Sequence, residues 1–354
     1  MKMQAFGRRV NLRGNNWKMH VLMAMLLIFS EALPAQAEQG ANEIRAARSV
    51  AEWSEYVQAV GKQDPKPWIA EVNHETDSLL RDFSDLTTQL SKEDWEAFLA
   101  SRKSGLLEYA TAVRIFGSEE IGSIVGAIAD SVNVIWEFTE GEKVANGIDM
   151  VLVNPDEMSW ESRVYYFQNG CYLGAQNVYH KYGIRGGKFA DTKGVSGAFH
   201  LVNQGSGTGI WQHSWLFYTA VNGHLVPAGA LLEEVNLANP CVYNRQLESK
   251  IVSYNPLTVR YEWTIELGYR YRGNQPTFKG KADVVYTANL ETGVMEPQFK
   301  SSNLNTEKLL AFDLGASKKL FLHAWNKELL AILKGKDSIK RKAVIEYLED
   351  EYSE

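Results

Sequence analysis

The sequence lacks the short motifs that identify several large classes of enzyme. No CxxC or HExxH spacing occurs in its 354 residues, so we expect no metal site on a single element and no cofactor. The glycine-rich residues 205–209 lack the lysine of a phosphate-binding loop and lie between two predicted strands, which favours a β-turn. No serine stands in a Gly-x-Ser-x-Gly elbow, and Ser214 would point away from His213 on a strand.

Cysteine is nearly absent, since the chain contains only Cys171 and Cys241. In an exported protein an even number of cysteines predicts a disulfide. A Cys171–Cys241 bridge would close a loop of about 70 residues and stabilise the fold by about 4 kcal/mol in the chain-entropy model. Two free thiols in a buried core are the alternative.

Long apolar runs are also missing. The run at residues 21–29 is too short to span a bilayer, and no later run is longer, so we expect no stable membrane span. Basic residues precede this run, and the small-x-small triplet Ala35-Gln36-Ala37 follows it. This order predicts a signal peptide at residues 1–37, cleaved after Ala37, and a periplasmic or secreted protein.

The chain also has no excess of basic residues over acidic ones. The formal net charge is −6, and loss of residues 1–37, with five basic residues and one acidic residue, changes it to −10. Such an acidic chain is a poor candidate for binding nucleic acid or an anionic membrane. We therefore expect a protein or a small molecule as the partner.

The clearest pattern that is present lies in residues 257–271. Apolar and aromatic side chains occupy every odd position, and polar or small residues occupy the even ones. This period of two predicts a long β-strand with one apolar face and one charged face. Residues 278–288 alternate in the opposite parity and predict its hairpin partner, with Arg260 and Glu262 facing charged residues of that strand.

The remaining patterns predict an α+β fold. We expect a helical region at 38–145, an antiparallel sheet of five to seven strands with an initial helix at 146–302, and C-terminal helices at 303–354 that pack on the sheet. Apolar residues at helical spacing predict helices at residues 119–136 and 157–182. Asn222-Gly223 is a strong signal for a tight hairpin.

Histidines form one concentration of side chains that could carry chemistry. His200, His213 and His224 lie on three successive predicted strands, with Glu233 or Glu234 nearby. If the strands are neighbours, these groups could form a metal site or an acid–base site. The alternative is three unrelated histidines that are partly buried or lie at the rim of the sheet.

Aromatic residues are the other concentration, at 11% of the chain. The leading hypothesis is a non-enzymatic binding or interaction protein of the bacterial periplasm, with a groove lined by Trp211, Trp215, Tyr261 and Trp263. A hydrolase that acts on an envelope polymer or ester through a His/Glu site is the alternative. A carrier of lipid or a small apolar ligand, with a cavity beside the helix at 119–136, is the second alternative.

Overall fold

The computed structural model describes most of the chain after residue 48. The described residues are 49–72, 83–124, 130–137, 148–153, 161–179, 188–192, 195–207, 210–222, 224–237, 243–267, 277–299 and 302–349. All of them belong to one compact unit, Arg48–Glu354. The predicted signal peptide at 1–37 lies outside the described residues.

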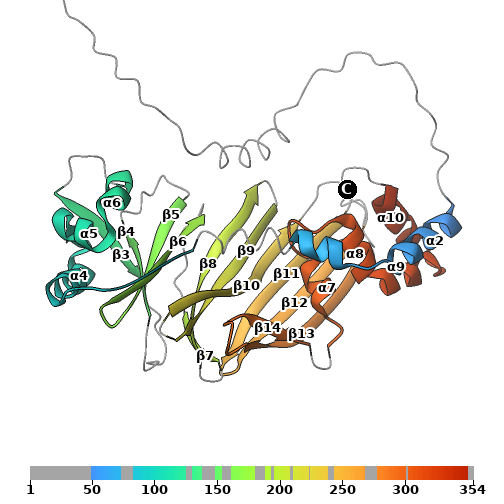
Figure 1. Cartoon of the computed structure of the whole chain (residues 1–354). Helices are drawn as coiled ribbons and strands as arrows, with labels where there is room; N and C mark the ends of the chain where they lie inside the picture. Colours follow the sequence, from blue (N-terminus) through green and yellow to red (C-terminus); the bar gives the residue numbers. More distant parts are fainter. Residues whose placement is uncertain are drawn as a thin grey trace, which may run out of the picture. The chain divides into compact units, whose positions relative to one another are not determined.

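In the described residues, the larger sheet has eight antiparallel strands that lie side by side in the order of the chain (Figure 1). Each strand pairs with its neighbours in sequence. The strands are β7 (Lys188–Thr192), β8 (Val195–Gly207), β9 (Ile210–Val221), β10 (His224–Leu237), β11 (Tyr243–Tyr254), β12 (Leu257–Leu267), β13 (Thr277–Ala288) and β14 (Met295–Gln298).

Strand β12 has the two faces that its sequence predicts. Its odd-numbered residues from Leu257 to Leu267 are all buried, and its even-numbered ones are half-buried or exposed. On the exposed face Arg260 lies opposite Asp283, and Nε of Arg260 is 2.7 Å from the Asp283 carboxylate. Glu262 lies opposite Lys281 at 2.6 Å. The predicted β12–β13 hairpin and its charge pairs are therefore confirmed.

A second sheet has six strands in the order β1-β6-β5-β4-β3-β2. Its pairs are antiparallel, and each strand is at most nine residues long. The strands are β1 (Ser84–Gln89), β2 (Leu106–Glu108), β3 (Ser131–Glu137), β4 (Asp149–Val153), β5 (Glu161–Gln168) and β6 (Cys171–Tyr179). The prediction of a single sheet with five to seven strands was thus wrong in number, because the described residues form two antiparallel sheets, of eight and six strands.

Two predicted helices are replaced by strands of this second sheet. Residues 119–136 contain the end of helix α6 (Ser118–Ile124) and then β3. Residues 157–182, including the expected initial helix, contain the β5–β6 hairpin. Asn169 and Gly170 both have positive φ, of 50° and 81°, which a tight hairpin turn requires.

The remaining helices fall into two groups. Helices α4 (Lys92–Ser104) and α5 (Tyr109–Phe116) pack on the six-stranded sheet. Ser91 is the N-cap of α4, and its side chain accepts a hydrogen bond from the Asp94 backbone N–H at 3.0 Å. The second group packs on the eight-stranded sheet around β12 and β13: α2 (Val50–Val60), α7 (Thr306–Leu310), α8 (Lys318–Ala324), α9 (Asn326–Leu333) and α10 (Ser338–Glu349) (Figure 1).

Three buried clusters hold these layers together. The largest joins the eight-stranded sheet to α2 and the C-terminal helices, as predicted for the chain's end. A second joins α4 and α5 to the six-stranded sheet. A third contains residues of both sheets, and in it the rings of Tyr166 and Tyr218 lie 5.0 Å apart between centroids.

The structure thus has an α+β fold with antiparallel sheets, as expected. Within its described residues, none of the helices has the length and apolar character needed to cross a lipid bilayer.

Candidate functional site

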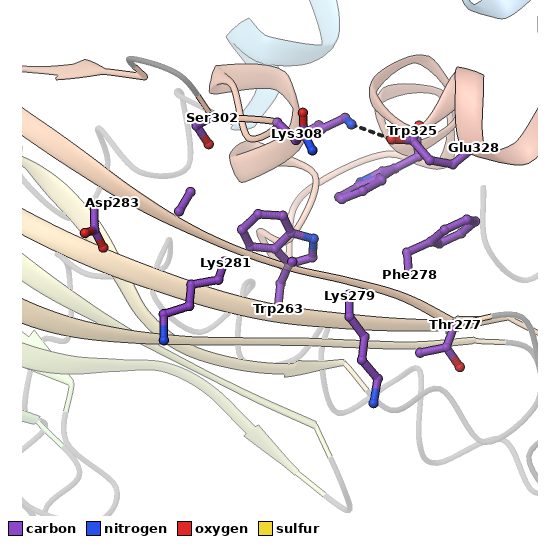
Figure 2. Close-up of a pocket in the computed structure, with 13 residues that line it drawn as sticks. Trp263, Thr277, Phe278, Lys279, Lys281, Asp283, Ser302, Lys308, Trp325 and Glu328 are labelled. Atoms are coloured by element: carbon purple, nitrogen blue, oxygen red, sulfur yellow. Dashed lines mark hydrogen bonds and ion pairs between the residues drawn. The ribbon is translucent and has the colours of Figure 1, made fainter.

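A pocket of about 570 Å³ lies between the β12–β13 hairpin and the C-terminal helices (Figure 2). Strand residues Trp263, Phe278 and Gly280 line one side of it. The other side includes Lys308 of α7 and Trp325, which separates α8 from α9. The pocket therefore combines aromatic rings from the sheet and the helices with an ammonium group.

Gly280 makes room for the indole of Trp263. The two residues lie opposite each other on β12 and β13. A Cβ atom placed on Gly280 would overlap the six-membered ring of Trp263. The indole can lie across β13 because this glycine carries no side chain, and Figure 2 shows it rising from the sheet toward the helices.

The helical side of the pocket is held by stacked rings and charges. The rings of Phe278 and Trp325 stack with centroids 6.0 Å apart and 20° between their planes. Nζ of Lys308 lies 4.4 Å from the centroid of the Trp325 ring and 2.7 Å from the carboxylate of Glu328. Since the side chain of Lys308 is only 14% exposed, water screens this ion pair less than a surface pair.

A second pocket of about 520 Å³ shares residues with the first. Asn303, Lys308 and Glu328 line both of them, and His323 lines the second pocket. The Lys308–Glu328 pair therefore borders two adjoining polar spaces, where hydrogen-bonding groups of a ligand could be bound.

The four aromatic candidates from the sequence do not share one groove. Trp263 lines the first pocket. Tyr261 is fully buried, its hydroxyl lies 3.0 Å from that of Tyr286, and burial raises its pKa well above the ordinary range. Trp211 and Trp215 are half-buried on β9 and line neither of the two pockets described above.

Of the histidine candidates, the structure brings His213 together with both glutamates. Nδ1 of His213 lies 3.8 Å from Oε2 of Glu233 and 3.6 Å from Oε2 of Glu234. All three side chains are at least partly shielded from solvent. Of the three histidines that the sequence offered with Glu233 or Glu234, His213 is thus the one that lies beside these glutamates.

The other two histidines lie elsewhere on the sheet. His224 is exposed at the start of β10, where Nδ1 is 3.2 Å from both the Asp85 carboxylate and the Thr87 hydroxyl. It is ten residues along β10 from Glu234, which corresponds to roughly 30 Å of extended strand. His200 pairs through its backbone with Leu216, and its side chain lies outside the described part of the structure.

Cys171, one half of the predicted disulfide, is a half-buried cysteine on β6 that the structure records as free. Cys241 lies outside the described residues, so the Cys171–Cys241 bridge stays a prediction.

Sequence reasoning missed most of the pocket. Lys308, Trp325 and Glu328 lie in a region predicted as helix, and their spacing of 17 and 3 residues matches no known ligand motif. The glycine in the otherwise alternating strand β13 was the one available signal, because a glycine inside a strand often marks a close approach of another group. Comparison of the chain with protein-family models, with curated proteins and with solved structures finds no match.

Proposed function

We propose that this protein is an exported, non-enzymatic binding protein whose ligand is a small polar molecule with a flat apolar face, such as a saccharide. Its export depends on the predicted signal peptide at residues 1–37, which would deliver it to the bacterial periplasm. The observation that supports the proposal most is the mixed lining of the pocket beside Trp263.

Each part of that lining suits one part of such a ligand. The half-buried ring of Phe278 offers an apolar surface for the C–H face of a sugar ring, and the buried indole of Trp263 lines the same pocket. Lys308 and Glu328, together with Asn303, supply donors and acceptors for hydroxyl groups. A concave site with a few fixed polar groups around aromatic rings is typical of small-molecule binding.

Saturation-transfer NMR with glucose, N-acetylglucosamine and their β-linked oligomers tests this proposal. We expect transfer to at least one of these sugars, and a clear loss in Trp263→Phe and in Glu328→Gln. Trp215→Phe is the matched control, since Trp215 is a half-buried tryptophan of the same sheet that lines neither pocket. The proposal fails if no sugar binds, or if Trp263→Phe and Trp215→Phe bind the sugar equally well.

A hydrolase is the second candidate, and the contacts of His213 with Glu233 and Glu234 favour it. A histidine oriented by a carboxylate can act as a general base. Hydrolysis of p-nitrophenyl acetate that is lost in His213→Asn but kept in His224→Asn would support this candidate, and no activity above the buffer rate would count against it. The lipid-carrier hypothesis relied on a helix at residues 119–136, where α6 and β3 form instead.

A further inference from the structure

A β-bulge brings two carboxylates to one imidazole on the eight-stranded sheet. On β9 and β10, Ser214 lies opposite Leu232 and His213 lies opposite Glu234, so Glu233 is an extra residue in the ladder. At such a bulge two consecutive residues oppose one residue of the partner strand. Glu233 and Glu234 therefore both face His213, although consecutive residues of a regular strand point to opposite faces.

The distances between His213 and the two glutamates are too long for direct hydrogen bonds and are close to those between atoms that bind one metal ion. The Nδ1 to Oε2 distances of 3.8 Å to Glu233 and 3.6 Å to Glu234 exceed the length of about 2.7–2.9 Å for a charge-assisted hydrogen bond. Two ligand atoms of a tetrahedral zinc ion with bonds of about 2.0–2.1 Å lie roughly 3.4 Å apart. The potential ligand atoms of all three residues lie within 4.8 Å of one another.

Charge and burial add a reason for a cation at this position. The side chains of His213 and Glu233 are each 19% exposed, and that of Glu234 is 37% exposed. Two carboxylates repel each other more strongly where water is partly excluded, and a divalent cation between them removes that repulsion. Because the side chain of Glu234 is 37% exposed, its carboxylate can be reached by an ion from the solvent.

We propose that His213, Glu233 and Glu234 bind one Zn²⁺ ion at the β9–β10 bulge. One imidazole and two carboxylates form a nitrogen and oxygen donor set that suits this ion, and three protein ligands leave a fourth position for water. The site stands apart from the pocket beside Trp263, so it can be tested independently of sugar binding.

His224 provides a matched control on the same hairpin. It also lies beside a carboxylate, with 3.2 Å between Nδ1 and Oδ2 of Asp85. This distance is that of a hydrogen bond, one carboxylate is involved, and both side chains are 52% exposed. His224 and Asp85 therefore have the features of an ordinary ion pair on the protein surface.

The experiment is a calorimetric titration of the untagged protein with ZnCl₂ at neutral pH, after dialysis against a chelator. We expect one ion per chain in the wild type and in His224→Asn. His213→Asn and the double variant Glu233→Gln/Glu234→Gln should weaken binding by more than about 100-fold, since loss of outer-shell partners alone costs about 10- to 100-fold. Zn²⁺ should also raise the melting temperature of the wild type and of His224→Asn.

Glu234→Gln provides a further test if the other variants do not fold. It changes the most exposed of the three side chains and keeps its shape, so we expect a folded protein with weakened Zn²⁺ binding. The proposal is overturned if the wild type takes up no Zn²⁺, the result expected of an imidazolium–carboxylate ion pair alone. Undiminished binding by His213→Asn or by folded Glu234→Gln would overturn it as well.

Discussion

The strands of the two sheets differ in whether one or both of their faces are buried. This difference decides whether a strand can be recognised in the sequence from its alternation of apolar and polar residues. β12 of the eight-stranded sheet has one buried face and one open face, so its sequence alternates. In β5 of the six-stranded sheet, Val164 and Tyr166 belong to one buried cluster, and Tyr165 and Phe167 belong to another. A strand that is buried on both faces is apolar throughout, and such a run resembles a buried helix.

Alanine substitutions at neighbouring positions would test this difference most strongly. In β5 we expect both Tyr166→Ala and Phe167→Ala to lower the free energy of unfolding by about 3–5 kcal/mol, because both rings are fully buried. In β12 we expect a similar loss for Trp263→Ala but a change within about 0.5 kcal/mol for its half-buried neighbour Thr264→Ala.

Urea unfolding followed by circular dichroism gives these free energies. A near-neutral effect of Tyr166→Ala or Phe167→Ala would show that β5 has an open face, and the contrast between the sheets would then disappear.

Gly280→Ala should have the next largest effect. The added methyl group overlaps the indole of Trp263 on the neighbouring strand, and overpacking of this kind costs about 1–3 kcal/mol. We also expect the displaced ring to reduce sugar binding in the pocket. The same urea experiment and the NMR titration measure both changes. A variant with the stability and binding of the wild type would show that the indole does not need this glycine.

Gly170→Ala tests the turn of the β5–β6 hairpin, which lies where the sequence predicted a helix. Gly170 has φ of 81°, and an alanine in this left-handed region costs about 1–2 kcal/mol. Gly122→Ala in α6 is the control, because nothing lies within 4 Å of the added Cβ and alanine favours a helix by about 0.5–1 kcal/mol. If the two variants have equal stability in urea, the turn at residues 169–170 does not need a glycine.

The smallest effect that we expect is a change in the pH dependence of the free energy of unfolding, and it comes from Asp313. It is buried in the α7–α8 loop, and desolvation raises its pKa above the ordinary 3.8, although Gly315 N–H and Gln212 donate to it and Arg245 lies nearby. The folded state then holds the proton more tightly than the unfolded state. Its contribution to stability is therefore present below pH 3.8 and is lost as the pH rises through the folded pKa.

Asp313→Asn removes this titration. The stability of the variant relative to the wild type should therefore increase as the pH is raised from about 4 to 7, within the range where carboxyl groups titrate. Urea midpoints of both proteins across that range measure the difference. A constant or decreasing difference would mean that the hydrogen bonds and Arg245 outweigh the desolvation of Asp313.

The residues that flank an Asn-Gly pair decide whether a hairpin turn is predicted from it, as two such pairs in the chain show. Asn222-Gly223 stands between segments that alternate, and the sequence predicts a hairpin there; β9 and β10 do pair across this position. Asn169-Gly170 carries the same turn chemistry, but apolar runs flank it and suggest a helix with an interruption. The turn residues favour positive φ in both cases, and burial of β5 on both faces hides the strand period in the second.

The candidate site could be predicted only in part. Trp263 was a candidate because it lies on the apolar face of an alternating strand, and Glu262 on the other face pairs with Lys281, as its position predicted. Lys308 and Glu328 come from two different helices, so the way these helices pack decides that the two charges meet. Residue spacing carries no information about such a contact.

By itself, the sequence determined the β12–β13 hairpin, its charge pairs and the C-terminal helices, because each depends on residues close together in the chain or on a strict period. The tertiary structure decided the second sheet, the pocket and the convergence of Glu233 and Glu234 on His213. The second sheet depends on burial of its strands from both sides, the pocket on the packing of separate helices, and the convergence on a bulge in the register between strands. None of these leaves a periodic trace in the sequence.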